Sequence, residues 1–180
     1  MKNLRHSVIA PWRKVTNQRW STDMCRVWAE LDGWATLALV VDSHTRELLG
    51  WHLSRSGKAT RASSALEQAL IARFGMLGPV RKPFLLRRDN RLVLTSRNYT
   101  APVRSYGLRQ TLIAPHCPQQ NGMVERVIRI LKAQYVRHHR FETLQHACRM
   151  IADWIQFYNH RRAHQALKMK TPAEAFALAA

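Results

Sequence analysis

The chain has 180 residues, 46% of them hydrophobic, which is enough to bury the core of one domain but too few for two comfortable domains. Twenty-nine lysines and arginines against eleven acidic residues give a formal charge of +18, so the expected partner is a polyanion. No stretch approaches the roughly 20 apolar residues of a membrane-spanning helix, and the three widely separated cysteines indicate neither a disulfide framework nor a structural zinc site.

The N-terminal half is predicted to contain a leader, a meander of strands and one helix. Residues 1–16 show no periodicity and Pro11 would interrupt any element, so we expect a leader ahead of a core domain of residues 17–180. The helix is predicted over Ala59–Phe74, where apolar side chains recur at helical spacing and a glycine follows. Short apolar runs separated by turn residues predict three antiparallel strands, Trp20–Trp28, Trp34–Asp42 and Glu47–Leu53.

Strands and helices alternate in the next part of the chain. The sequence predicts a strand at Phe84–Leu86, a helix over Ser96–Tyr106 and a strand over Leu108–Ala114. Because such alternation is typical of crossover connections, we expect these strands to pair in parallel with the meander. The fold class is therefore α/β with a mixed sheet.

Two long amphipathic helices and one short helix are predicted at the C-terminal end. The second long helix covers about Thr143–Tyr158, and Thr171 with Pro172 opens the short one as N-cap and first helical residue. The buried stripe of the first long helix is predicted to be Val124, Ile128, Leu131 and Tyr135.

Three acidic side chains stand at informative places. Asp23 lies inside an apolar strand, where a carboxylate must be paired or bound to metal to offset its loss of hydration. Asp89 follows a strand, the position where open α/β sheets present ligand-binding groups. Glu125 lies early in an amphipathic helix and shares a face with Arg129 and Lys132.

Each acid also has an ordinary structural interpretation. Asp23 could pair with a neighbouring arginine at a strand edge, and Asp89 could cap a turn. Glu125 could form an i,i+4 salt bridge with Arg129 on a solvated helix. Their joint arrangement is more informative, because thirty-five residues separate Asp89 from Glu125 and the segment Pro118-Gln-Gln-Asn-Gly-Met-Val precedes the glutamate.

Several further segments combine with these acids into one pattern. They are Gln18-Arg-Trp-Ser-Thr-Asp23, Val40-Val-Asp-Ser-His-Thr-Arg46, Gly50-Trp51, Asp89-Asn90, Pro115-His-Cys-Pro-Gln-Gln-Asn-Gly-Met-Val-Glu125-Arg126, Phe157-Tyr-Asn-His-Arg-Arg162 and His164-Gln-Ala-Leu167. From about Asn17 to the C-terminus, the chain resembles the DDE transposases of bacterial insertion sequences, whose second reading frame carries a retroviral-integrase-like core. The resemblance implies a ribonuclease H-like fold with a mixed five-stranded sheet flanked by helices.

The resemblance also implies a catalytic triad of Asp23, Asp89 and Glu125 that binds two Mg²⁺ or Mn²⁺ ions. Carboxylate oxygens are hard ligands that suit these cations, and two ions about 4 Å apart can activate a nucleophile and stabilise the leaving oxygen. By resemblance to this family, water would first attack a phosphodiester at the transposon end, and the freed 3′-hydroxyl would then attack another phosphodiester in an in-line displacement.

The partners implied by the resemblance are DNA, further copies of the chain and a separate helix-turn-helix transposase subunit. We expect no membrane partner and a location in the bacterial cytoplasm, with the nucleoid, because the N-terminal segment lacks a secretory signal.

Basic residues beyond the glutamate are expected to contact DNA. Arg129 and Lys132 lie one and two turns after Glu125 and would face the DNA backbone near the metal ions. Residues near the C-terminal signature, Arg161, Arg162 and His164, would contact DNA or, equally, cap the preceding helix through its unpaired carbonyls. The predicted DNA-binding residues are Arg126, Arg129, Lys132, Arg161, Arg162 and His164.

The sequence departs from the family pattern around the second acid. Ser-Asp-Asn-Gly followed by an aromatic residue is usual, whereas this chain has Arg88-Asp89-Asn90-Arg91 with Leu94. If position 91 needs a positive φ, a residue other than glycine costs on the order of 1 kcal/mol there. Arg87, Arg88 and Arg91 also crowd Asp89 and would compete with a metal as its counter-ion.

Two alternatives to an active transposase follow from these departures. Ala163 stands where a proline is usual, and the family's upstream helix-turn-helix region is absent from the sequence. One alternative is a catalytically inactive, truncated remnant that only binds DNA. The other is a ribonuclease H-like nuclease that hydrolyses nucleic acid without strand transfer.

Overall fold

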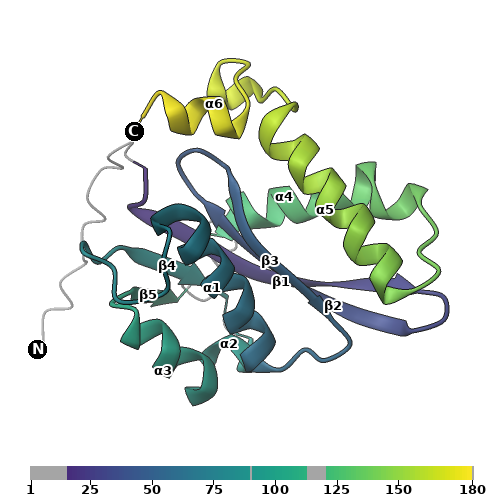
Figure 1. Ribbon diagram of the computed structural model, residues 1–180, viewed down its shortest axis with the longest axis horizontal. Helices are drawn as coiled ribbons and strands as arrows, with labels where there is room; N and C mark the ends of the chain where they lie inside the picture. Colours follow the sequence, from purple (N-terminus) through teal and green to yellow (C-terminus); the bar gives the residue numbers. More distant parts are fainter. Residues whose placement is uncertain (1–15, 90, 113–120, 180) are drawn as a thin grey trace, which may run out of the picture.

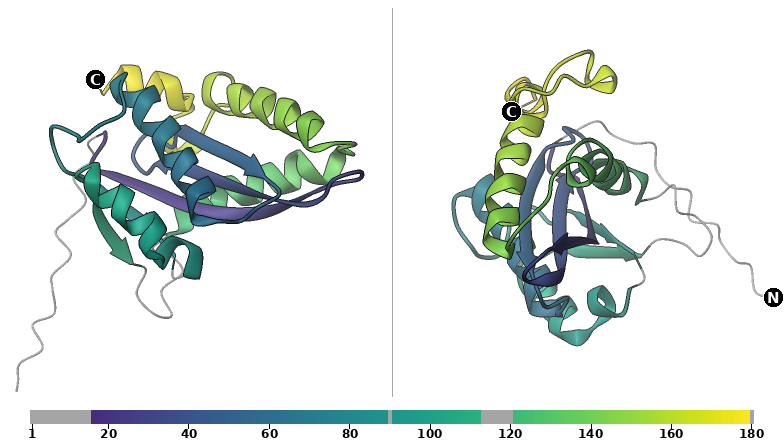
Figure 2. Two further views of the ribbon diagram at one scale, coloured as in Figure 1. Left: turned by 60° about the horizontal axis from the view of Figure 1, so that its bottom comes forward. Right: turned by 90° about the vertical axis from the view of Figure 1, so that its right-hand side faces the viewer.

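The computed structural model describes residues 16–89, 91–112 and 121–179, which form a mixed sheet with helices on both faces (Figures 1 and 2). The strands are β1 (Arg19–Ala29), β2 (Gly33–Asp42), β3 (Leu48–Ser54), β4 (Leu85–Arg88) and β5 (Arg109–Leu112). The helices are α1 (Ala59–Phe74), α2 (Leu92–Thr95), α3 (Arg97–Ser105), α4 (Gly122–Gln134), α5 (Leu144–His160) and α6 (Pro172–Ala177), with short 3-10 turns η2 (Val136–His138) and η3 (Gln165–Leu167). None of these helices is long and apolar enough to cross a membrane.

The strand order is β3-β2-β1-β4-β5. β1, β2 and β3 form an antiparallel meander, and β4 and β5 extend the sheet in parallel with β1. The predicted mixed five-stranded sheet is therefore confirmed, as are the bounds of the three meander strands to within one residue. β4 runs two residues past its predicted end, to Arg88. The predicted leader and the last two residues of the predicted strand Leu108–Ala114 lie outside the described residues, except for residue 16.

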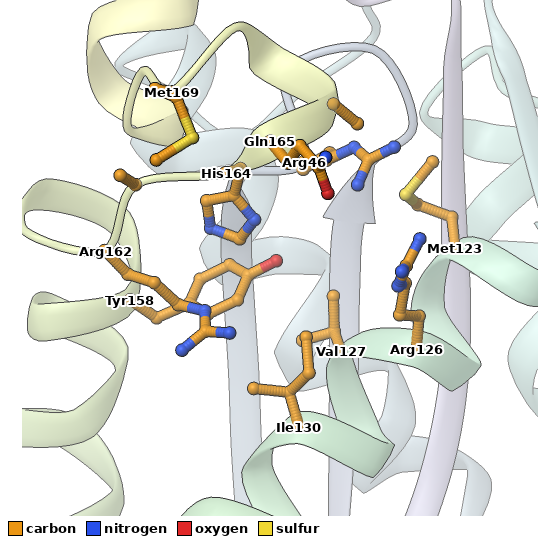
Figure 3. A pocket seen from close by; sticks show the side chains of 12 residues that line it. Arg46, Met123, Arg126, Val127, Ile130, Tyr158, Arg162, His164, Gln165 and Met169 are labelled. Atoms are coloured by element: carbon orange, nitrogen blue, oxygen red, sulfur yellow. The ribbon is translucent and has the colours of Figure 1, made fainter.

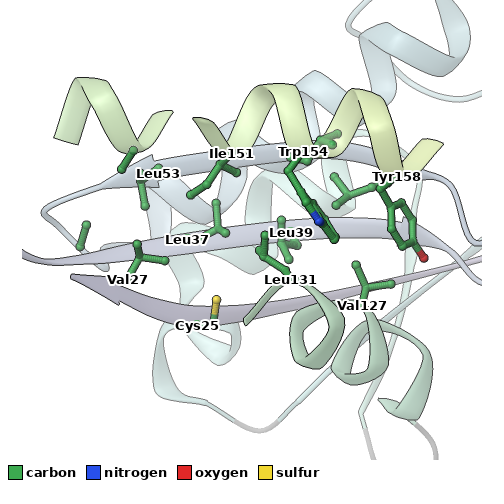
Figure 4. Packing of buried hydrophobic residues seen from close by; sticks show 14 of the residues in the cluster. Cys25, Val27, Leu37, Leu39, Leu53, Val127, Leu131, Ile151, Trp154 and Tyr158 are labelled. Atoms are coloured by element: carbon green, nitrogen blue, oxygen red, sulfur yellow. The ribbon is translucent and has the colours of Figure 1, made fainter. Parts of the chain in front are cut away.

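Alternate side chains of β1 and β2 enter two separate hydrophobic cores. Cys25 and Leu39 lie in the core between the sheet and helices α4 and α5 (Figure 4). Met24 and Val40 lie in the core on the other face, with α1 and α3. Because successive side chains of a strand point to opposite faces, Asp23 takes the same face as Cys25. That face is the one covered by α4.

The long C-terminal helices differ in how well their buried faces match the prediction. Every expected apolar position of α5 is buried, from Ala147 to Tyr158. In α4 the buried residues are Val124, Val127 and Leu131, at spacing i, i+3 and i+7. The two other predicted positions, Ile128 and Tyr135, are partly buried and pack against the same core, with Ile128 beside a pocket and Tyr135 just after the last helical residue.

Two hydrogen bonds from the side chain of Asn159 connect α5 to the edge strand β3. Its Oδ1 accepts a hydrogen bond from the backbone N–H of Leu48 at 3.0 Å, and its Nδ2 donates to the carbonyl of Leu48 at 2.9 Å. The Asn159 side chain is buried, so water does not replace these bonds. This residue of the Phe157-Tyr-Asn-His signature therefore has a structural role.

Replacement of Asn159 by alanine is expected to lower the free energy of unfolding by about 2–3 kcal/mol, because it leaves two buried backbone groups of Leu48 without partners. Urea denaturation followed by circular dichroism measures this loss. Gln156→Ala, at an exposed position of the same helix, serves as the matched control, with an expected change within about 0.5 kcal/mol. A loss for Asn159→Ala no larger than for the control would contradict the role of this bond pair.

Candidate active site

The register of two parallel strands brings two of the predicted acids together. β1 and β4 pair in parallel with Thr22 opposite Arg88. One residue further along each chain, Asp23 and Asp89 stand side by side. Asp23 is almost completely buried, while the Asp89 side chain is 23% exposed at the end of β4.

The third acid reaches the same place from α4. Glu125 lies in the first turn of this helix, and with Asp23 it lines an open pocket of about 620 Å³. Arg91, Arg129 and Lys132 line the same pocket. The structure thus gathers three acids and two of the predicted DNA-binding residues from three separate segments of the chain, β1, the end of β4 and α4.

Arg91 lies between the two aspartates. Its Nε is 2.7 Å from Oδ2 of Asp89, and its Nη2 is 3.6 Å from Oδ1 of Asp23. Its Nη1 also donates to the carbonyl oxygen of Met24 at 2.6 Å. One guanidinium group therefore pairs with both carboxylates, which is the competition that the sequence predicted for Arg91.

The prediction that further arginines crowd Asp89 holds for Arg88, whose charge interacts with that of Asp89. Arg87 and Arg88 are buried on β4, and Nε of Arg88 donates to Oε1 of Gln110 at 2.8 Å. The expected strain is absent, because Arg91 has φ −60° and ψ 137°, an extended conformation that any residue adopts. Position 91 thus requires no glycine, and the charge of Arg91 is its main consequence.

The electrostatics of the pocket centre on Asp23. Burial is the largest of the causes that raise the pKa of Asp23 to about 6, and the negative charges of Asp89 and Glu125 add to it. A hydrogen bond of 2.7 Å from the backbone N–H of Met24 and the charge of Arg91 act in the opposite direction. Three carboxylates that influence one another in this way form a site that attracts cations.

The donor set fits a hard divalent cation in its chemistry, since it consists of carboxylates. In the structure the Arg91 guanidinium is the cation beside these carboxylates, because it contacts both Asp23 and Asp89. Across residues 16–89, 91–112 and 121–179, no three His, Cys, Asp or Glu side chains are positioned to hold a metal ion. A divalent cation would therefore have to take the place of the Arg91 guanidinium.

The six predicted DNA-binding residues do not form one surface. Arg129 and Lys132 line the acid pocket. Arg126, Arg162 and His164 line a second pocket, on the opposite face of α4 (Figure 3). Arg161 is exposed at the end of α5 and lines neither of these two pockets.

His164 has the capping contact that the sequence left open. It is 7% exposed, and its ring bonds to the backbone of Tyr158 in the last turn of α5. Nη1 of Arg162 donates to Oε1 of Gln134 at 2.7 Å. Arg46 and Tyr158 also line this pocket, although the sequence analysis did not assign either residue to a site. The only indication in the sequence was that each residue belongs to one of the segments shared with the transposase family.

Comparison with known proteins agrees with this geometry. Residues 14–118 match the family described as integrase core domain, and residues 106–172 match a second family of the same description. The chain belongs to the integrase core domain family. It is a transposase or integrase catalytic domain, as the sequence resemblance predicted.

Curated relatives of this integrase core domain include proteins of bacterial insertion elements. An uncharacterized protein of insertion element IS136 from Agrobacterium fabrum is 27% identical over 161 residues, covering 88% of this chain and 82% of the relative. Transposase InsF for insertion sequence IS3A from Escherichia coli is 27% identical over 151 residues, covering 82% of this chain. The chain spans 50% of the length of that transposase.

Solved structures share the fold. The HTLV-2 integrase catalytic core domain in complex with magnesium has a TM-score of 0.67 at 19% identity, covering 89% of this chain and 97% of that one. A chain of the simian T-cell lymphotropic virus intasome has a TM-score of 0.73 at 20% identity, covering 91% of this chain and 55% of that one. The predicted ribonuclease H-like fold is confirmed.

Proposed function

We propose that this integrase core domain cleaves and joins DNA as part of an insertion-element transposase, with Asp23, Asp89 and Glu125 as its catalytic carboxylates. The observation that carries the proposal is the convergence of these three acids, from β1, the end of β4 and α4, beside a pocket that is otherwise basic. Ion pairs between Arg91 and the two aspartates would not require a third carboxylate, Glu125, close to the buried Asp23. Membership of the family supports the same assignment.

The triad would hold Mg²⁺ or Mn²⁺, which supplies the activation of water or a 3′-hydroxyl and the stabilisation of the leaving oxygen. The HTLV-2 integrase core has been solved with magnesium, which supports a divalent cation. Arg129 and Lys132 would hold backbone phosphates against the carboxylates, because both side chains line the acid pocket. Arg91 would have to leave the aspartates before DNA is cut.

A second candidate function is DNA binding without cleavage. The observation in its favour is the bridge that Arg91 makes between Asp23 and Asp89. A protein of this kind would occupy transposon ends without cutting them. The formal charge of +18 supports DNA binding in both cases and cannot separate them.

The proposed partners are transposon-end and target DNA, further copies of the chain and a separate helix-turn-helix subunit. The HTLV-2 core has been solved in dimeric and trimeric forms, which supports self-association. Sedimentation with end DNA, with and without a helix-turn-helix subunit from the same element, measures both interactions. One copy of the chain per DNA molecule under all conditions would contradict self-association.

Glu125→Gln and Asp23→Asn are each expected to reduce metal-dependent nicking to the level of the EDTA control while leaving DNA affinity within about twofold, because each substitution keeps the side-chain shape and removes one ligand charge. The assay follows labelled duplex DNA with the ends of the element, in Mg²⁺ or Mn²⁺ against EDTA, and a full-length relative that cuts the same DNA is the positive control. Glu142→Gln, at an exposed position outside the pocket, is the matched control.

Normal cleavage by either triad variant would contradict the assignment of the triad. Binding without nicking by the unchanged chain, on DNA that the relative cuts, would favour the second candidate function. The same assay in the Arg91→Ala background then shows whether the carboxylates themselves are competent.

A further inference from the structure

The second pocket beside α4 is separate from the acid site. It has a volume of about 640 Å³ and is lined by Arg46, Arg126 and Arg162 (Figure 3). The three arginines come from the turn between β2 and β3, from α4 and from the segment after α5. In α4, residues 126, 127 and 130 line this pocket, and residues 125, 129 and 132 line the acid pocket. One helix therefore separates a pocket that contains carboxylates from a pocket that no acidic residue lines.

The charge of this pocket is uncompensated within the described part of the chain. No acidic residue lines it, and none of its three arginines forms an ion pair with an acid in residues 16–89, 91–112 or 121–179. Burial lowers the pKa of Arg46, and the neighbouring Arg126 lowers it further. Guanidinium groups gathered in this way match the oxygens of a phosphate group in charge and geometry.

Arg46 also holds an unusual backbone conformation. Its φ of +62° lies in the left-handed region, which a long side chain seldom adopts. The N–H of Arg46 bonds to the carbonyl of Asp42 at 2.9 Å within the same turn. Strained residues of this kind gather at ligand sites, and here the strained turn carries a guanidinium into the pocket.

His164 adds a different kind of group to the pocket. Its Nε2 is buried and has no hydrogen-bond partner, while the ring bonds to the backbone of Tyr158. Burial, followed by the charges of Arg162 and Arg46, lowers the pKa of His164, so the ring is neutral at neutral pH. A neutral imidazole that donates its one N–H to a carbonyl presents a lone pair at the other nitrogen. The partner that Nε2 lacks is therefore a donor, such as a hydroxyl or an amino group.

The rest of the pocket wall is mostly apolar, with Gln165 as a further polar side chain. Met123, Val127 and Ile130 of α4 lie on one side, with Tyr158 on the side of α5 (Figure 3). The Tyr158 ring lies 4.9 Å from the His164 ring, centroid to centroid. A phosphate ion alone would leave this wall and the Nε2 acceptor unused, whereas a nucleotide supplies a phosphate, a flat apolar base and a donor.

We infer that this pocket binds one nucleotide, with its phosphate on Arg46, Arg126 and Arg162 and its base or sugar against Tyr158 and His164. The volume lies within the range of about 300–1,000 Å³ that small-molecule sites occupy. A nucleotide within a DNA strand and a free mononucleotide offer the same chemistry. Binding of a nucleotide within a DNA strand rests on the proposed function. In that case the pocket is a second DNA contact, on the opposite side of α4 from the carboxylates.

The test compares two ligands on the full chain. Isothermal titration calorimetry measures binding of 2′-deoxyadenosine 5′-monophosphate, with deoxyadenosine as the ligand that lacks phosphate, and fluorescence anisotropy measures binding of labelled end DNA. Arg126→Gln and Arg46→Gln are each expected to weaken binding at least about tenfold, because each removes a charge-assisted hydrogen bond. Arg149→Gln, which removes the same charge from an exposed position of α5, is the matched control. Thermal unfolding checks that each variant is folded.

A loss of mononucleotide affinity beyond that of the control supports a site for free nucleotides. A loss for DNA alone, with a smaller salt dependence than the control variant shows, supports a nucleotide held within the strand. If neither ligand loses more affinity than with Arg149→Gln, the inference is wrong. Nicking of end DNA by the unchanged chain is measured separately from these affinities. A chain that binds DNA but never cuts it would contradict the proposed function, whereas the inference about this pocket depends only on the binding results.

Discussion

Arg91→Ala is expected to raise metal-dependent nicking of end DNA by about tenfold or more. The Arg91 guanidinium contacts Asp23 and Asp89 at 3.6 and 2.7 Å, and these are two of the three proposed metal ligands. Two unit charges 4 Å apart interact by about 4 kcal/mol at an effective dielectric constant near 20. Because the Arg91 side chain is 51% exposed, solvent screens part of this energy. A residual competition of about 1.4 kcal/mol already corresponds to a tenfold change in cation affinity.

The measurement is the rate of nicking as a function of Mg²⁺ and Mn²⁺ concentration. The half-maximal concentration should fall in Arg91→Ala, whereas Arg91→Lys, which keeps the charge, should stay nearer the unchanged chain. Arg104→Ala removes a charge from an exposed position of α3 and is the control for a general effect of charge on DNA binding. The double variant Arg91→Ala/Glu125→Gln should not cut. Equal cation requirements in Arg91→Ala and the unchanged chain would show that the guanidinium does not compete with the metal.

The second large effect is expected at Gly50, where alanine should lower the free energy of unfolding by about 3 kcal/mol or more. A Cβ atom at this position would lie 2.1 Å from the carbonyl oxygen of Ala65 and 2.7 Å from the backbone nitrogen of Ala69. Both atoms belong to the backbone of α1, so they cannot move aside without a shift of the whole helix. Overpacking of a core costs typically 1–3 kcal/mol even where side chains can adjust, and domains of this size are stable by only about 5–15 kcal/mol.

Urea denaturation of Gly50→Ala measures this effect, with Gly78→Ala as the control because nothing lies within 4 Å of a Cβ atom built there. The control should change the unfolding free energy by no more than about 0.5 kcal/mol. A variant Gly50→Ala as stable as the control would mean that α1 does not lie as close to β3 as the structure has it.

The elements that the sequence predicted best have local signals at their ends. The predicted bounds of α1 agree with the structure because Gly75 adopts φ +76° and its N–H bonds to the carbonyl of Ile71, a stop signal that glycine provides at no steric cost. The Thr171 and Glu174 capping box likewise starts α6 at the predicted residue. By contrast, α2 was not predicted, since its four residues are too few for any helical period to be seen.

The candidate site was predictable in its composition and less so in its geometry. The arrangement of Asp23, Asp89 and Glu125 in the sequence was enough to predict that these three acids lie close together. That Arg91 would contact Asp23 as well as Asp89 depended on the parallel pairing of β4 with β1 and on the start of α2 at Leu92, which no local pattern indicates. The nucleotide pocket joins segments that are far apart in the sequence, and side-chain convergence over such distances has no local signal.

The contact between Asn159 and Leu48 has a consequence for how the chain behaves among other copies of itself. The strand order leaves β3 at an edge of the sheet, and the free N–H and C=O groups of an edge strand are a template on which a strand of another chain can add. The side-chain amide of Asn159 uses one N–H and its carbonyl oxygen, the same pair of groups that a peptide unit offers, and it occupies both groups of Leu48. It therefore fills the place of one residue of an additional strand. The contact from α5 thus covers part of the open edge of the sheet. Without this contact, the edge of β3 would be free to pair with a strand of another molecule, which favours aggregation.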